Sequence, residues 1–118
     1  MADSFSFYVQ RYFMSYLMKQ HNYGANTISS YRDTFKLLYS FLVNTDVNVS
    51  RIVIDDISYD KVIEFMTWLG ETRKNGVSTK NVRLAHIKSF FRYVMMTAPE
   101  HSDQCRKVLS IPFGKEDK

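Results

Sequence analysis

Lys88 and Arg92 are the two cations whose spacing most directly suggests chemistry, because residues four apart lie on the same side of a helix. Ala85 and Ser89 occupy the same side, and small side chains let a helix approach a nucleic-acid backbone closely. The surrounding segment 72–98 carries six basic and no acidic side chains. This pattern predicts cations that reach phosphates or base edges of a nucleic acid.

Two further groups of polar residues fit the same chemistry. Ser78, Thr79 and Lys80 stand at the predicted start of the helix that carries Lys88, where free N–H groups and the helix dipole favour an anion such as phosphate. Asn26, Thr27 and Ser30 form a similar small polar face on an earlier segment. Structural roles remain open for several of these residues. Asn26 and Ser78 can be helix caps, Arg32 can lie along the surface of a bundle, and Lys88 and Arg92 can be solvated charges.

Residue patterns of enzymes are missing from the sequence. There is no HExxH, P-loop or GxGxxG pattern, and the three histidines are scattered. His101 and Cys105 are four residues apart but supply only half of a zinc site, so surface helix residues are the simpler interpretation. Several of the eight tyrosines fall on predicted core faces, without a cluster of groups that would activate a nucleophile. We therefore predict no catalytic residues, no bound metal and no cofactor.

The elements that must position the basic residues are helical. Apolar residues recur at helical spacing in four segments, and a fifth is shorter; the predicted helices are 4–19, 25–43, 59–69, 79–96 and 101–109. Segment 21–24 is expected to end the first helix, with Gly24 as the breaker. Ser58 and Ser78 are the expected caps of the third and fourth helices. The fold class is thus all-α, a compact bundle of four to five helices.

The apolar positions also predict the core faces of the two later long helices: Val62, Phe65, Met66 and Leu69 on the third, and Leu84, Ile87, Phe91 and Val94 on the fourth, with Phe90 and Met95 at its edges.

Two other features stay open. On the first helix Phe5, Val9, Tyr12, Phe13 and Tyr16 form the core stripe, whereas Phe7, Met14 and Met18 form a second stripe. That second stripe either packs within the bundle or forms a contact between protomers. Segment 44–57 contains Val47, Val49, Ile52 and Ile54, which could form a short strand, but a packed loop is preferred because no second strand is available.

Composition and charge support a small DNA-binding domain. The 118 residues are 45% hydrophobic and suffice for one domain. A single cysteine suits a reducing cytoplasm, and the sequence has neither a signal peptide nor an apolar run long enough for a membrane span. The net charge of +4 is unevenly distributed, because segment 44–71 carries six acidic and two basic residues. A basic segment beside an acidic one is typical of a nucleic-acid face with an opposite, solvated face.

Two motifs resemble those of a known family. NTISSYR with a following FL (residues 26–42) and GVSTKNVRLAHIKSFFRY (residues 76–93) resemble the paired helices of the N-terminal core-binding domain of tyrosine recombinases, the phage integrases and Xer-type proteins. The resemblance covers about residues 5–112 and implies a SAM-like fold of two crossed helix pairs, which forms half of a clamp around duplex DNA. It implies DNA contacts by ten residues: Asn26, Thr27, Ser30, Arg32, Lys36, Thr79, Lys80, Arg83, Lys88 and Arg92. Gly24 departs from the serine cap that the family often has.

The resemblance also implies how the chain is organised. Residues 1–112 would be the core-binding domain and residues 113–118 the start of a linker to a catalytic domain that is absent here. The implied partners are double-stranded DNA, that catalytic domain, and further protomers in a tetramer on DNA, the isolated domain being a monomer. The alternative is a helical protein-interaction module. A helix-turn-helix regulator fits less well, because the long acidic loop replaces the tight turn of that motif.

Overall fold

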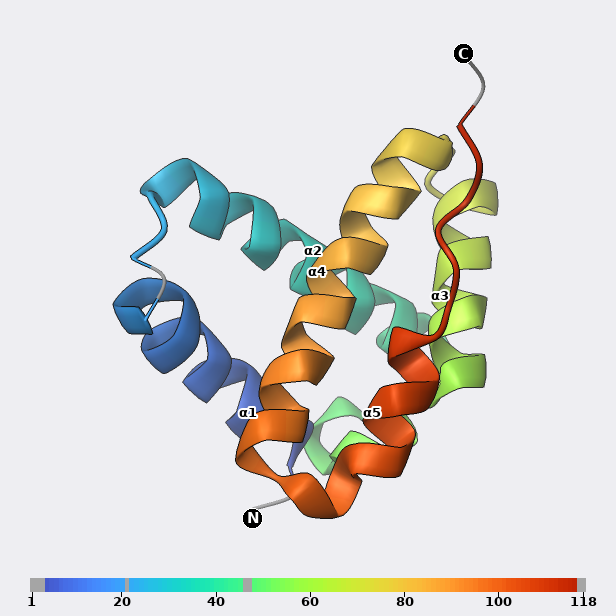
Figure 1. The fold of residues 1–118 in the computed structure, drawn as a ribbon. Helices are drawn as coiled ribbons and strands as arrows, with labels where there is room; N and C mark the ends of the chain where they lie inside the picture. Colours follow the sequence, from blue (N-terminus) through green and yellow to red (C-terminus); the bar gives the residue numbers. More distant parts are fainter. Residues whose placement is uncertain (1–3, 21, 46–47, 117–118) are drawn as a thin grey trace. The chain divides into compact units, whose positions relative to one another are not determined.

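The computed structural model describes residues 4–20, 22–45 and 48–116. Within these ranges every regular element is helical, apart from one isolated antiparallel bridge between Ser4 and Val53 (Figure 1). The elements are α1 (Phe5–Arg11), the π-helix η1 (Tyr12–Gln20), α2 (Ala25–Asn44), the 3₁₀ turns η2 (Val49–Arg51) and η3 (Ile54–Asp56), α3 (Tyr59–Glu71), α4 (Val77–Thr97), the 3₁₀ turn η4 (Pro99–His101) and α5 (Ser102–Leu109). The predicted all-α class is confirmed. His21 of the predicted turn and Val47 of the candidate strand lie outside the described residues.

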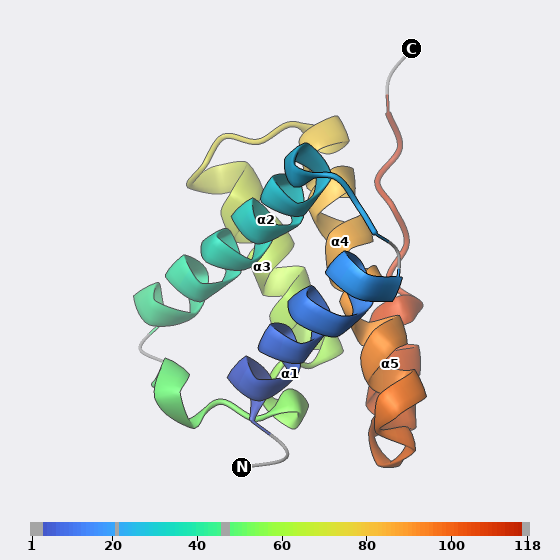
Figure 2. The same ribbon diagram turned by 90° about the vertical axis from the view of Figure 1, so that its left-hand side faces the viewer.

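The chain divides into two compact units, Met1–Asp56 and Ile57–Lys118. In the first unit, η1 packs along α2 (Figure 2). The Phe13 and Phe35 rings meet edge to face there, with their centroids 5.6 Å apart. The start of α1 is joined to the loop after α2, because the Phe5 N–H donates to the Ile52 carbonyl at 3.0 Å. Ile52 and Ile54 are buried. In the described part of segment 44–57 the packed loop is therefore confirmed, built from 3₁₀ turns.

The first predicted helix changes its winding at Tyr12. The predicted stripe continued at α-helical spacing from Tyr12 to Tyr16, but the fully buried residue is Leu17. Tyr12 and Leu17 are five residues apart, which is the hydrogen-bond spacing of a π-helix. The wider turn of η1 therefore places Leu17 in the core and leaves Tyr16 half-buried, stacked on the Tyr12 ring at 5.5 Å.

The connection from η1 to α2 has its sharp bend at an asparagine. Asn22 adopts a left-handed backbone with φ of 52°, a conformation that asparagine tolerates better than most residues. Gly24, the predicted breaker, has an ordinary φ of −69° and is instead the N-cap of α2, without a side-chain cap. The start of α2 thus lacks the hydrogen bond that a serine would provide.

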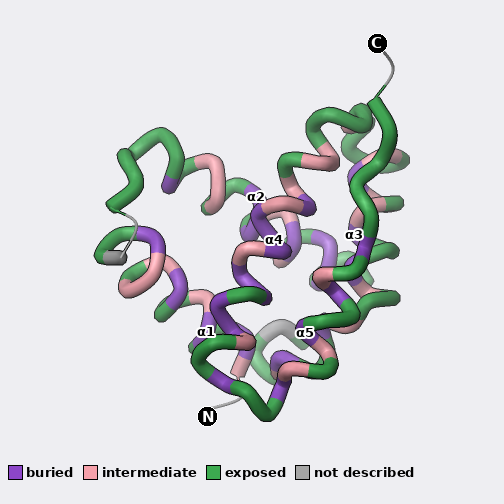
Figure 3. Tube along the Cα trace, viewed as in Figure 1, coloured by how far each residue is buried: buried purple, intermediate pink, exposed green. Residues whose placement is uncertain are grey.

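The second unit contains α3, α4 and α5. Its core includes Val62, Phe65 and Leu69 from α3 and Leu84 and Ile87 from α4, all fully or almost fully buried, as predicted. Met66, also predicted for the core, is half-buried. Figure 3 shows buried stretches, in purple, on α3, α4 and α5. α5 packs on both longer helices. Its Gln104 side-chain amide donates to the Ile57 carbonyl at 2.8 Å, which ties α5 to the segment that precedes α3.

Ser58 is the N-cap of α3, as predicted. Its hydroxyl accepts a hydrogen bond from the Lys61 N–H at 3.2 Å, which satisfies one of the free donors of the first turn. We expect Ser58→Ala to lower the free energy of unfolding by about 1 kcal/mol, measured by urea denaturation. Thr67→Ala, an exposed change on the same helix, is the control and should shift stability by less than about 0.5 kcal/mol. Equal effects of the two changes would mean that the cap does not stabilise α3.

Ser78 does not cap α4, contrary to the prediction. The helix begins at Val77, and its N-cap is Gly76, which makes no side-chain cap. Ser78 therefore lies within the first turn, where its hydroxyl is free to bond outward. Its partner belongs to the C-terminal segment described below.

Candidate nucleic-acid interface

The outward side of α4 is narrow. Eight of its residues are buried: Leu84, His86, Ile87, Lys88, Phe90, Phe91, Tyr93 and Val94. Part of the remaining surface follows a line of residues three or four apart: Ser78, Val82, Ala85, Ser89, Arg92 and Met96. Small side chains at 85 and 89 therefore do lie on one line with Arg92, which is exposed. Sequence periodicity had placed Phe90 only at the edge of the core, yet it is fully buried.

Lys88 does not lie on that outward line, and its predicted exposure is wrong. Only 8% of the residue is exposed, and its ammonium nitrogen lies 4.3 Å from the centre of the Phe113 ring. Burial, and then the nearby charge of Arg92, lower the pKa of Lys88 below its usual value. The aromatic ring stabilises the charged form by a cation–π contact, so the lysine is held at the flank of α4 instead of in solvent.

The other predicted residues of α4 point in different directions. Thr79 is exposed in the first turn, whereas Lys80 and Arg83 are half-buried. The Lys80 ammonium lies over α3, since a Cβ added to Gly70 would be 3.2 Å from it. Nine residues separate Arg83 from Arg92, which is about half a turn beyond two full turns, so the two guanidinium groups leave opposite sides of the helix. One face of α4 therefore presents Arg92 but neither Lys80 nor Arg83.

His86 is a buried titratable group next to these cations. Burial, followed by the positive charge of Arg83, lowers the pKa of His86 to about 4. Only 8% of the residue is exposed, and the neutral imidazole is the form that the fold accommodates. The sequence indicated no role for His86, because burial of the imidazole depends on the tertiary packing and cannot be read from residue spacing alone.

The depressed pKa of His86 predicts a loss of stability in mild acid. Between about pH 6.5 and pH 4 the unfolded chain binds a proton at His86 that the folded chain does not, so the free energy of unfolding falls as the pH falls through this range. We expect a loss on the order of 2 kcal/mol, smaller than the full shift would give because the ring keeps some contact with water. Urea denaturation at several pH values would measure it. His86→Gln should flatten this dependence, and an unchanged slope would assign it to another group.

The predicted residues of α2 form two separate groups. Asn26 and Thr27 are exposed in the first turn, and Ser30 is half-buried one turn later. Arg32 follows Asn26 by six residues, and Lys36 follows Ser30 by six. Six residues correspond to about 240° around an α-helix. The polar group and the two cations therefore occupy different sides of α2.

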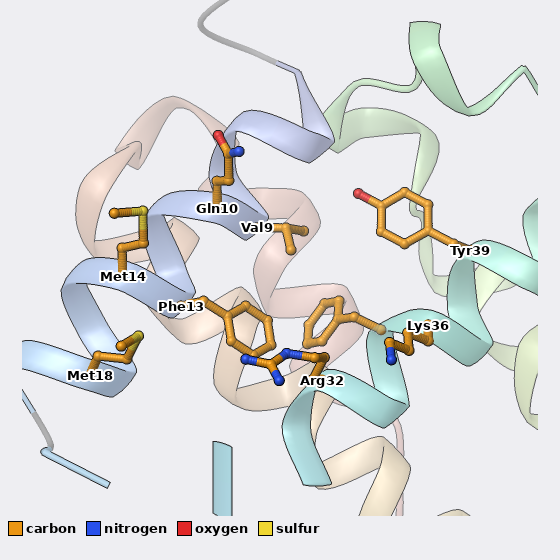
Figure 4. Close-up of a pocket in the computed structure, with 9 residues that line it drawn as sticks. Val9, Gln10, Phe13, Met14, Met18, Arg32, Lys36 and Tyr39 are labelled. Atoms are coloured by element: carbon orange, nitrogen blue, oxygen red, sulfur yellow. The ribbon is translucent and has the colours of Figure 1, made fainter. Parts of the chain in front are cut away.

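Arg32 and Lys36 border an apolar hollow between η1 and α2. The hollow has a volume of about 350 Å³, and its lining residues come from the end of α1, from η1 and from α2: Val9, Gln10, Phe13, Met14, Met18, Arg32, Phe35, Lys36 and Tyr39 (Figure 4). Met14 and Met18 are 63% and 54% exposed. Phe7 of the same predicted stripe is also exposed and carries the Arg11 guanidinium 5.3 Å from its ring centre. In this structure the second stripe of the first helix is thus largely a surface feature.

The C-terminal segment lies along the start of α4, which the sequence did not indicate. The Asn81 side-chain amide pairs with both backbone groups of Gly114: it donates to the carbonyl at 3.0 Å and accepts from the N–H at 2.9 Å. The Ser78 hydroxyl donates to a carboxylate oxygen of Glu116 at 2.7 Å. Figure 1 shows the segment, in red, running beside α3 and α4. Ser78 and Asn81, two polar residues of the predicted contact helix, are therefore already hydrogen-bonded to the C-terminal segment.

Other candidate sites are not supported in the described part of the chain. No three His, Cys, Asp or Glu side chains among these residues gather where they could hold a metal ion. His101 and Cys105 are both buried, so their interpretation as surface residues is wrong. None of the helices found in the described ranges is long and apolar enough to cross a membrane.

Comparison with known proteins identifies the family. Residues 10–97 match the model described as "Phage integrase, N-terminal SAM-like domain". Similar proteins include "Putative integrase/recombinase y4rC" of Sinorhizobium fredii, 37% identical over 88% of the chain and 32% of that protein, and "Putative integrase/recombinase y4rD" of the same organism, 33% identical over 91% and 38%. "Tyrosine recombinase XerC" of a Roseiflexus species is 33% identical over 88% of the chain and 32% of its own length.

The match extends over most of this chain but over a smaller part of each relative. The chain spans about a third of the length of the curated relatives it matches. No solved structure matches it. The family model, however, includes α2, α3 and α4 almost entirely, the elements on which the resemblance of the two motifs rests. The chain belongs to the phage integrase N-terminal SAM-like family, the core-binding domains of tyrosine recombinases.

Proposed function

We propose that this chain is a non-catalytic DNA-binding domain of a site-specific recombinase or integrase, which contacts duplex DNA through α2 and α4. The observation that carries the proposal is the outward line of α4, where Ala85 and Ser89 leave room for a phosphate backbone and Arg92 extends beyond them. The acid-free composition of segment 72–98 adds a positive potential along this helix.

The first turns of both contact helices support the same proposal. Asn26 and Thr27 on α2 and Thr79 on α4 are exposed near free backbone N–H groups, which favour phosphate. Arg32 and Lys36 lie on the other side of α2. They would contact a more distant part of the DNA backbone or would make no contact with DNA. Lys80, Arg83 and Lys88 remain among the ten proposed DNA-contact residues. Because they are buried or half-buried, their side chains would need to move before they reach DNA.

We infer that the chemistry of strand exchange is carried out outside this chain. None of the ten proposed contact residues is a nucleophile paired with a general base, and the relatives are about three times as long. The proposed partners are a catalytic domain and further protomers, four in all on DNA, in a cytoplasmic protein, with the isolated chain monomeric. Covalent attachment of this chain to a nicked duplex, seen as a DNA adduct in denaturing gels, would contradict the non-catalytic assignment.

Fluorescence anisotropy with a labelled duplex tests the proposal. We expect a dissociation constant of roughly 10⁻⁴ to 10⁻⁶ M, typical of non-specific electrostatic binding. With about four phosphate contacts, log K should fall against log salt with a slope near −3.6. Asp55→Asn, a charge change in the acidic loop, should alter binding far less than changes on α4. Binding that is absent at low salt, or independent of salt, would reject the DNA-binding function.

A second candidate function is supported by the hollow between η1 and α2. Its apolar lining and the exposed Met14 and Met18 are typical of surfaces that receive an apolar side chain from another protein. If duplex DNA does not bind in the anisotropy experiment, this protein-interaction role becomes the better interpretation of the chain.

A further inference from the structure

The C-terminal strap, which we define as residues 111–116, contacts α4 through three of its residues. Phe113 covers the Lys88 ammonium. Both backbone groups of Gly114 are bonded to the Asn81 amide, and the Glu116 carboxylate accepts a hydrogen bond from the Ser78 hydroxyl. Ile111, at the start of the strap, is 2% exposed.

The strap fits α4 closely at Gly114. A Cβ added at this position would lie 3.1 Å from the Cγ1 of Val77, so a side chain there would force the strap or the valine to shift. The Asn81 amide uses a donor and an acceptor on the same residue, as a neighbouring β-strand would. The packing of the strap on α4 therefore depends on the backbone groups of Gly114 and on its lack of a side chain. These contacts hold a segment without regular secondary structure against the helix.

The strap also places a negative charge where an anion is favoured. Ser78 lies in the first turn of α4, whose N–H groups and dipole attract anions. The Glu116 carboxylate is bonded there at 2.7 Å. A phosphate that accepts a hydrogen bond from the Ser78 hydroxyl would compete with the carboxylate, because the hydroxyl has a single donor.

We propose that the strap is an internal competitor for DNA: it holds Glu116 at the phosphate position of α4 and withholds Lys88 beneath Phe113. This inference rests on the proposed DNA-binding function. Displacement of the strap frees Ser78, Asn81 and the Lys88 ammonium together, since the three contacts lie on one short segment. Docking of the strap and contacts of DNA with Ser78, Asn81 and Lys88 then exclude each other, whereas Arg92 stays accessible in both states.

The first test measures strap docking without DNA. The rate at which an amine-modifying reagent labels each lysine is followed by mass spectrometry in the unaltered chain and in Phe113→Ala. Labelling of Lys88 should be slow in the unaltered chain and several-fold faster in the variant, whereas the exposed Lys36 should not change. Met96→Ala, which removes an exposed apolar side chain from α4, is the matched control. An unchanged Lys88 rate in Phe113→Ala would overturn the inference whatever the DNA result.

The second test measures competition. Phe113→Ala and Glu116→Gln should each bind duplex DNA several-fold more tightly than the unaltered chain, and Phe113→Ala should steepen the salt slope by about 0.9 as Lys88 gains a phosphate. Adding Lys88→Ala to Phe113→Ala should remove that extra slope. Glu100→Gln removes an exposed carboxylate elsewhere in the same unit and controls for net charge.

The outcomes separate the inference from the proposed function. If the unaltered chain binds DNA and Glu116→Gln improves binding no more than Glu100→Gln, the strap is structural and the competitor role is wrong. If neither the unaltered chain nor Phe113→Ala binds DNA while Lys88 labelling does accelerate, the DNA-binding function itself fails. Tighter binding of both strap variants with faster labelling in Phe113→Ala supports the competitor role.

Discussion

Arg92→Ala is expected to weaken duplex binding and to reduce the slope of log K against log salt by about 0.9 if the guanidinium reaches a phosphate. Arg92 is exposed on the line of α4 that also carries Ala85 and Ser89. If the side chain reads a base edge instead, discrimination at one position should fall by roughly 1–3 kcal/mol. Anisotropy titrations at three salt concentrations, on two duplexes of different sequence, distinguish the two modes.

Arg106→Ala is the matched control for Arg92. Arg106 is an exposed arginine of α5 that is paired with Asp103 on its own helix, so its removal changes the net charge by the same amount away from the proposed contact. Exposed pairs of this kind contribute little to stability, and folding should be unaffected. Equal losses for Arg92→Ala and Arg106→Ala would show that net charge, and not the outward line of α4, determines binding.

Phe90→Ala is expected to lower the free energy of unfolding by about 3–5 kcal/mol. The Phe90 ring is fully buried and meets Phe91 edge to face at 5.3 Å. Its removal would leave a cavity that a closely packed helical core fills only in part. Such a loss is a large share of the 5–15 kcal/mol typical of a domain, so the variant should unfold at much lower urea concentration.

Val82→Ala is the control for Phe90, because Val82 lies on the same helix but is 47% exposed. It should change the free energy of unfolding by less than about 0.5 kcal/mol. Sequence periodicity places Phe90 at the edge of the core, which would predict a smaller effect than full burial does. A loss near 1 kcal/mol in Phe90→Ala would therefore favour the edge position over the buried one.

Local signals were enough to predict most of the helices. The spacing of apolar residues and a serine at position 58 define α3, and both act within a few residues of one another. The predicted bounds of α2 and α4 differ from the structure by no more than two residues at either end. The π-helix η1 was not predicted, because the sequence offers two apolar stripes, one through Tyr12 and Tyr16 and one through Tyr12 and Leu17. Packing against α2 selects the stripe through Leu17.

The sequence by itself determined the all-α class, the family and the acid-free composition of segment 72–98, because each depends on residue type and spacing alone. Only the tertiary structure decided which cations of that segment are available. Lys88 and Arg92 are equivalent in the sequence, four residues apart on one helix. Phe113, 25 residues beyond Lys88 in the chain, covers the lysine and leaves the arginine exposed. Helical periodicity cannot predict that contact, because it joins residues whose separation in the chain bears no relation to a helical turn.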